Sequence, residues 1–138
     1  MIKQLGHLLG IVFLSNMASF ALMMLLFLVI LPKSWYGYEL AVPTWIGIAL
    51  LTGIFSHWYF HLYPPRVQDV VIAILAWTIL PFVVSVLYAL LTLGDANYVV
   101  RSLDTYVQYA LQVIVVGVMG YIARREYAVR LIGEGRSL

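Results

Sequence analysis

Four long stretches of this chain contain no Asp, Glu, Lys or Arg, and together they cover most of its 138 residues. They are residues 5–31, 44–62, 70–93 and 106–123. A helix of about 20 apolar residues spans the hydrocarbon core of a bilayer, and a helix satisfies its own backbone hydrogen bonds there. The sequence therefore predicts an all-α integral membrane protein, built as a bundle of four transmembrane helices.

Composition agrees with this fold class and leaves no room for a soluble domain. Charged residues make up 10% of the chain, against about 25% in soluble proteins. We expect a single membrane domain over residues 1–138, with a basic C-terminal tail at 124–138; the alternative is that residues 126–132 extend the last helix by a turn or two before Gly133. The apolar run at 5–31 is too long for the core of a signal peptide, so we expect it to remain as the first helix. With no cysteine, disulfides and thiolate metal sites are excluded.

The cationic side chains predict the orientation of the bundle. Four spans place both termini on one side, and six cations fall on that side against two on the other. The six are Lys3, Arg66, Arg124, Arg125, Arg130 and Arg136, and the two are Lys33 and Arg101. Positive residues favour the cytoplasmic side. We therefore expect cytoplasmic termini, in the plasma (inner) membrane of a bacterium or archaeon.

Prolines divide the chain and predict where helices begin, end and bend. Pro32 should end the first helix, and Pro43 suits the first turn of the second, where its missing N–H does no harm. Pro81 should bend the third helix. The short connection at 63–69 predicts that the second and third helices are antiparallel neighbours.

Small residues identify faces on which helices can pack closely, since association in lipid depends on close contact. Along one ridge of the second helix, the residues that recur every fourth position are Ala49, Gly53, His57 and His61. The first helix offers Gly6 and Gly10, and the fourth offers Gly117 and Gly120. Packing within the bundle is the favoured interpretation, and contact with another chain is the alternative.

Three polar side chains fall near the middle of the predicted bilayer, namely Asn16, Thr78 and Gln112. Polar groups facing lipid are unfavourable, so we expect them to face inward or toward a partner. They either fix the register of the helices by hydrogen bonds or line a solute-binding layer, with Pro81 permitting movement.

The histidines form the one group with potential chemistry. His57 and His61 lie one helical turn apart on one face, and His7 begins the first helix on the same side of the membrane, with Asp69 nearby. Neutral imidazole is a common ligand of Zn, Cu and Fe. Interfacial hydrogen bonding is the favoured interpretation. Metal or haem binding is the alternative, and haem would need His7 or a partner's histidine opposite the pair.

No catalytic motif accompanies these residues: the chain lacks a P-loop, GxGxxG, GxSxG and HExxH. Arg124, Arg125 and Arg130 are expected to meet anionic lipid headgroups, and no nucleic-acid partner is expected. The leading hypothesis is a small non-catalytic membrane protein that requires no cofactor, acting as an accessory or scaffold subunit or as a homo-oligomer. The alternatives are a small transporter or channel that acts as an oligomer, and a metal- or haem-binding redox subunit.

Overall fold

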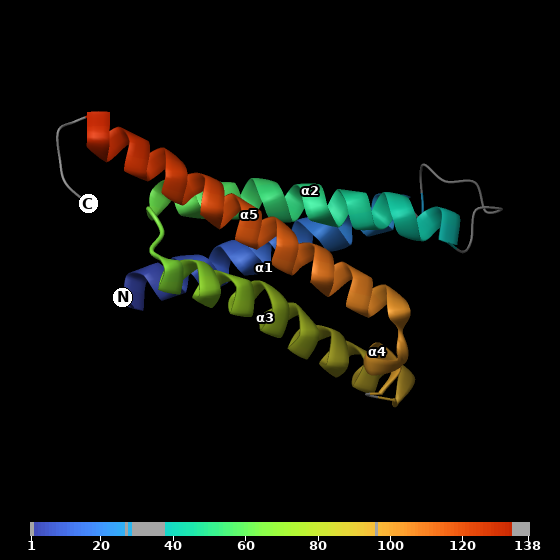
Figure 1. The fold of residues 1–138 in the computed structure, drawn as a ribbon. Helices are drawn as coiled ribbons and strands as arrows, with labels where there is room; N and C mark the ends of the chain where they lie inside the picture. Colours follow the sequence, from blue (N-terminus) through green and yellow to red (C-terminus); the bar gives the residue numbers. More distant parts are fainter. Residues whose placement is uncertain (1, 27, 29–37, 96, 134–138) are drawn as a thin grey trace.

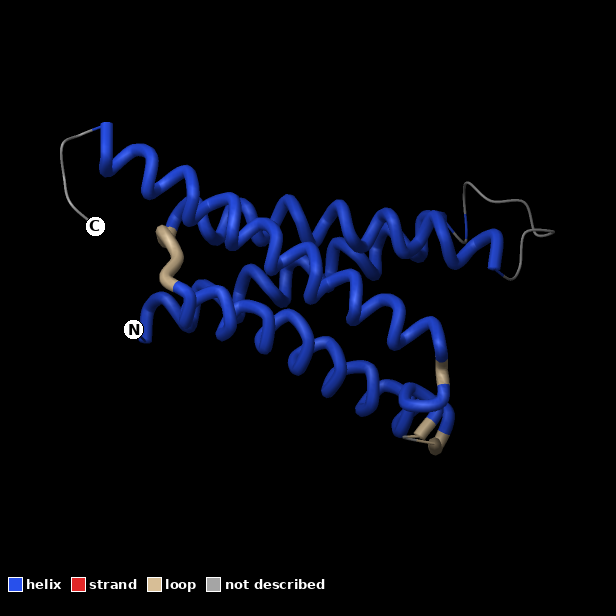
Figure 2. The backbone as a smooth tube through the Cα atoms, viewed as in Figure 1, coloured by secondary structure: helices blue, strands red, loops and turns tan. Residues whose placement is uncertain are grey.

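The computed structural model describes residues 2–26, 28, 38–95 and 97–133, and this part of the chain contains helices and no strands (Figure 1). The tube view shows a short connection between α2 and α3 (Figure 2). The all-helical prediction is confirmed. The helices are α1 (Ile2–Leu25), α2 (Tyr38–Leu62), α3 (Val67–Leu93), the short α4 (Tyr98–Arg101) and α5 (Leu103–Gly133).

Three helices are long and apolar enough to cross a membrane: α1 from Lys3, α3 and α5. Their outer surfaces carry large apolar side chains with no protein cover; Leu91 is 83% exposed and Ile132 is 69% exposed. Water-soluble proteins rarely expose continuous apolar surface of this kind. These three helices therefore indicate a membrane protein.

The long helices form a four-cornered bundle in which α1 and α5 each lie beside both α2 and α3. As a result, α2 and α3 are antiparallel but diagonal, while α2 and α5 run in the same direction (Figure 1). The prediction that α2 and α3 are neighbours is wrong. Their connection, residues 63–66, contains two consecutive prolines and ends on the extended backbone of Arg66. Four residues reach at most about 13 Å, and helices spaced about 9 Å apart have a diagonal of similar length.

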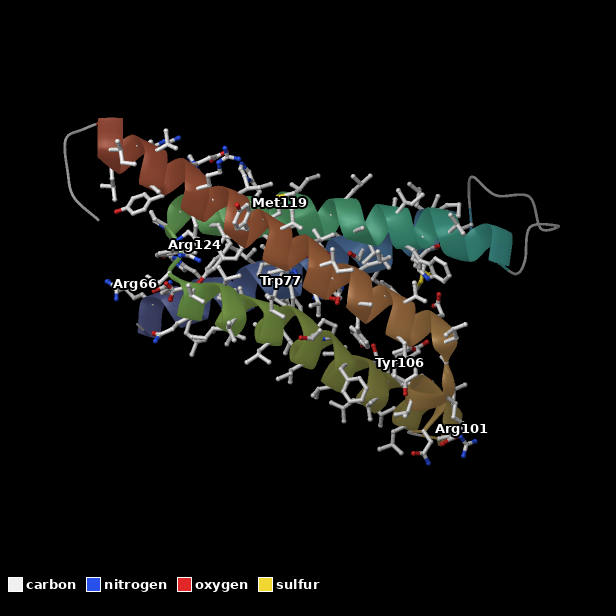
Figure 3. The ribbon with its side chains drawn as sticks, in the orientation of Figure 1. Arg66, Trp77, Arg101, Tyr106, Met119 and Arg124 are labelled. Atoms are coloured by element: carbon white, nitrogen blue, oxygen red, sulfur yellow. The ribbon has the colours of Figure 1, made fainter. Side chains whose placement is uncertain are left out.

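One half of the bundle is tightly packed, and we call it the closed half. It contains the N-terminus of α1 and the connection between α2 and α3 (Figure 1). Trp77 lies at the inner end of this half, where its ring packs on Tyr59 across the diagonal with centroids 6.4 Å apart (Figure 3). The buried cluster of this half is Leu8, Ile11, Val12, Tyr59, Phe60, Ala73, Trp77 and Val116.

The other half, which we call the open half, ends at the connection between α3 and α5. There α1 and α2 separate from α3 and α5 (Figure 1). Gly94 ends α3 in the left-handed region (φ 69°) and its N–H bonds to the carbonyl of Leu90, a common helix ending that favours glycine. The Tyr106 hydroxyl donates to the Val100 carbonyl at 2.8 Å, which ties α5 to α4.

Two predicted helix boundaries need correction. Pro43 lies inside α2 rather than at its start. The helix expected at 106–123 runs from Leu103 to Gly133, so the arginines at 124, 125 and 130 lie on a helix and not in a tail. Arg and Glu are good helix formers, so the end of an apolar stretch does not end the helix. The predicted end of α1 at Pro32, the loop with Lys33, and residues 134–138 lie outside the described residues.

Candidate functional site

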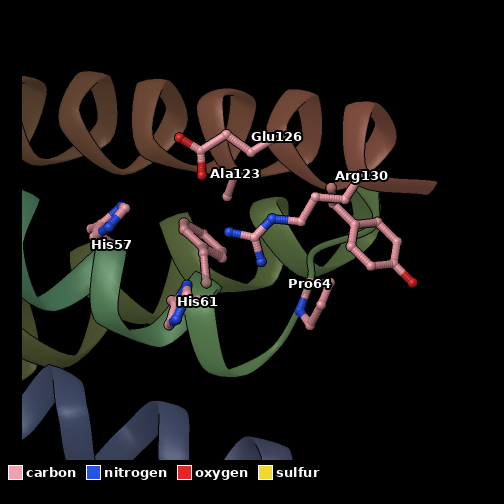
Figure 4. A pocket seen from close by; sticks show the side chains of 8 residues that line it. His57, His61, Pro64, Ala123, Glu126 and Arg130 are labelled. Carbon is pink, nitrogen blue, oxygen red and sulfur yellow. The ribbon is translucent and has the colours of Figure 1, made fainter. Parts of the chain in front are cut away.

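His57 and His61 lie on the side of α2 that faces α5. Their rings are stacked with centroids 6.3 Å apart. Both side chains are exposed and line a small pocket with Glu126 and Arg130 from α5 (Figure 4). The cavity measures about 40 Å³, which holds water but is far too small for haem.

His7 does not join this pair. Its Nδ1 shares a hydrogen bond with the Tyr63 hydroxyl, on the side of α2 that faces α1. The Asp69 carboxylate, expected near the histidines, accepts the backbone N–H of Arg66 at 2.8 Å and caps the start of α3. His7 therefore joins the start of α1 to the end of α2, and Asp69 caps the start of its own helix.

The structure does not assemble a three-ligand metal centre from His7, His57 and His61. Among the described residues, no group of three or more His, Asp or Glu side chains could hold a metal ion. The Arg130 guanidinium also extends toward the His61 ring (Figure 4), and its positive charge opposes a bound cation. Metal binding by His57 and His61 alone stays a prediction.

The three predicted mid-bilayer side chains differ in their surroundings. Gln112 is buried. Asn16 and Thr78 are half-buried and bond to their own helices: the Asn16 amide donates to the Val12 carbonyl at 2.7 Å, and the Thr78 hydroxyl donates to the Ile74 carbonyl at 2.5 Å. Neither bond joins two helices.

Three buried polar atoms on different helices have no hydrogen-bond partner among the described residues: Thr52 Oγ1, Trp77 Nε1 and Gln112 Oε1. We call them the polar layer. All three side chains are at most 2% exposed. A buried unpaired polar group costs about 1–3 kcal/mol, so these atoms lower the stability of the bundle unless a polar partner reaches them.

A cavity of about 320 Å³ lies in the open half, between all four long helices. Its polar lining includes Asn16, Ser85, Gln108 and Asp104. Ile48, Pro81 and Gln108 also line it, and each is four residues from a member of the polar layer. Since residues four apart are stacked one turn apart on a helix, the polar layer lies one turn below the cavity.

Asp104 lies at the start of α5, where the cavity meets the end of the bundle. Its carboxylate accepts the indole N–H of Trp45 from α2. Among the described residues, no Lys or Arg forms an ion pair with Asp104. The exposed carboxylate therefore lies beside the cavity without a described cationic side chain paired to it.

Outside the bundle, a wide apolar groove of about 780 Å³ runs between α2 and α5. It extends along α2 from Val42 to His57, about 22 Å at 1.5 Å per residue. Ala49 and Gly53 lie on its α2 side and fill little of it, whereas Leu50 and Ile54 stand at 63% and 64% exposure.

The glycines fall into two groups. A Cβ on Gly53, Gly117 or Gly120 would meet a neighbouring helix; at Gly120 it would lie 2.7 Å from Val70. A Cβ on Gly6 or Gly10 would meet nothing within 4 Å. The expectation that the α1 glycines pack is therefore wrong for this bundle.

The basic end of α5 is open to its surroundings. Arg124, Arg125 and Arg130 are all exposed, on the last turns of the helix. Their contact with lipid headgroups stays a prediction.

Two features of the site escape the sequence analysis. Trp77 was not singled out, although it lies four residues before Pro81 and so one turn from the predicted bend. The pairing of Trp45 with Asp104 was also missed, although both stand near the start of helices that run in the same direction.

The chain matches no protein-family model, no curated protein and no solved structure. A proposal for its function therefore rests on its own residues.

Proposed function

We propose that this chain is a small non-catalytic membrane subunit with four spans and cytoplasmic termini, which packs against a transmembrane helix of a second copy or of a larger membrane protein. In this proposal α2 is the fourth span; its 25 residues reach about 37 Å. Positive charges gather at the closed-half end of the bundle, from Lys3, Arg66 and the end of α5. Because positive residues favour the cytoplasmic side of a membrane, they support placing this end in the cytoplasm.

The groove between α2 and α5 carries the proposal. Its length is a large part of the hydrocarbon thickness of about 30 Å, as required for a site that accepts a membrane helix. The small side chain of Ala49 permits the backbone of another helix to approach closely. The walls are almost wholly apolar, so the contact is made by van der Waals packing.

Photocrosslinking from the groove tests the proposal, because the chain has no cysteine of its own. Leu50→Cys places one thiol in the groove, and Ile79→Cys places one on the exposed face of α3, where the side chain is 56% exposed. Each variant is labelled with benzophenone maleimide in native membranes and irradiated, and the adducts are identified by mass.

We expect a protein adduct from the Leu50→Cys variant and lipid adducts alone from the Ile79→Cys variant. The mass of the protein adduct distinguishes a second copy from another subunit. In the Leu50→Cys background, Ala49→Leu should lower the protein adduct several-fold by narrowing the groove. Ala110→Leu, on an exposed part of α5 away from the groove, should leave it unchanged. Lipid adducts alone from the Leu50→Cys variant would overturn the proposal.

A further inference from the structure

The open-half cavity has the size and lining of a ligand site. Its volume of about 320 Å³ lies at the lower end of the range of about 300–1,000 Å³ found for small-molecule pockets. Apolar side chains, among them Phe13, Phe20 and Leu80, provide most of its surface, and a few polar groups converge on it. This division suits a small amphipathic molecule.

The charged side chains that line the cavity indicate which kind of molecule it can bind. Among the described residues that line the cavity, Asp104 is the one acidic side chain, and there is no Lys or Arg. Its described hydrogen-bond partner, the Trp45 indole, is neutral. Apolar walls concentrate the field of a carboxylate into the space between them, so this cavity favours a cation and repels a phosphate or a second carboxylate.

Aromatic rings add to this preference. Phe13 is 56% exposed and Phe20 is 50% exposed, and both line the cavity from α1. The face of an aromatic ring attracts an organic cation through the negative charge of its π-electrons. The same rings give apolar contact to the body of such a ligand.

We propose that the open-half cavity binds a small organic cation with an apolar body, such as an alkyl- or arylammonium. Its positive nitrogen lies at the Asp104 carboxylate, and its apolar part lies against Phe13 and Phe20. This site is separate from the groove between α2 and α5, and all of its described lining comes from a single copy of the chain.

Calorimetric titration tests the site in nanodiscs of neutral phosphatidylcholine, with empty nanodiscs as the blank. The probe is benzyltrimethylammonium, whose charge does not change with pH, and benzyl alcohol is the neutral comparison. The wild type should bind the cation saturably and the alcohol at least about tenfold more weakly, because only the cation is attracted by the carboxylate.

Variants then locate the charge that is recognised. Asp104→Asn should weaken binding of the cation at least about tenfold, since it removes that attraction, and Asp104→Glu should retain most of the affinity. Asp95→Asn is the matched control, because Asp95 pairs with Arg101 at 3.9 Å and does not line the cavity; it should leave the affinity unchanged.

Three results would overturn the proposal: no saturable binding to the wild type, equal affinity of wild type and Asp104→Asn, or equal affinity for the cation and the alcohol. If Asp104→Asn loses helix content by circular dichroism, the comparison of the two probes on the wild type still decides the outcome.

Discussion

The closed and open halves are built from the same four long helices, yet only one of them fills its interior. In the closed half, Tyr59 and Trp77 bridge the diagonal, and Gly120 lets α5 approach Val70 of α3. In the open half, Pro81 and Gln108 line a cavity instead. The difference shows that large rings on the diagonal, combined with glycine on the sides, close a bundle that apolarity alone leaves open.

This contrast follows from how helices associate in lipid. Apolar side chains gain little by leaving lipid for protein, so close packing and hydrogen bonds decide where helices meet. Asn16 adds no interhelical bond to the open half, because its amide bonds to its own helix. One described hydrogen bond, from Trp45 to Asp104, joins α2 to α5 in this half, and a cavity remains between the helices.

The largest expected effect is on the closed half. Trp77→Ala removes the central ring and should lower the free energy of unfolding by about 3–5 kcal/mol. Phe82→Ala, in the open half, removes a ring that is already 38% exposed and should cost about 1 kcal/mol or less. Both values come from unfolding by SDS in mixed micelles, followed by circular dichroism. Equal losses would mean that the two halves do not differ in packing.

A smaller effect is expected at the helix contacts. Gly120→Ala places a Cβ 2.7 Å from Val70 and should lower the stability by about 1–3 kcal/mol through overpacking. Gly10→Ala is the matched control, because its Cβ meets nothing within 4 Å. The same unfolding titration measures both variants. If the Gly120→Ala variant is as stable as the Gly10→Ala variant, the packing described for the closed half is incorrect.

The smallest effect concerns the boundary between the halves. Thr52→Val removes an unpaired buried hydroxyl and should raise the free energy of unfolding by about 1 kcal/mol. Thr78→Val loses a hydrogen bond to Ile74 and should lower it by about 0.5 kcal/mol. The comparison uses the same titration. A loss of stability in Thr52→Val would show that its hydroxyl has a partner, such as a bound water.

The helices could be predicted from the sequence better than their arrangement. Uncharged apolar stretches located α1, α2, α3 and α5, because the requirement for an apolar span is read directly from composition. The apolar stretches could not predict that α2 and α3 lie at opposite corners of the bundle, since this depends on the path of the chain between Tyr63 and Val67. They left open whether α5 continues to Gly133, because helix formation does not require apolar residues.

The candidate site was predicted only in part, for a similar reason. Depth along each helix identified Gln112 and Asn16, but depth does not determine which way a side chain points around the helix axis. The rotation of each helix about its own axis places Gln112 inside the bundle and leaves Asn16 half-buried. It also separated His7 from His57 and His61, because α1 and α5 contact different sides of α2.

The length of α5 has a mechanical consequence. Its 31 residues measure about 46 Å, while hydrocarbon is about 30 Å thick. This length exceeds the hydrocarbon thickness by roughly a third of the helix, and the arginines are predicted to keep that end at the surface. When a bilayer thins or thickens, a rod held in this way responds by changing its tilt. Its inclination against the shorter α1 thus varies with the lipid that surrounds the protein.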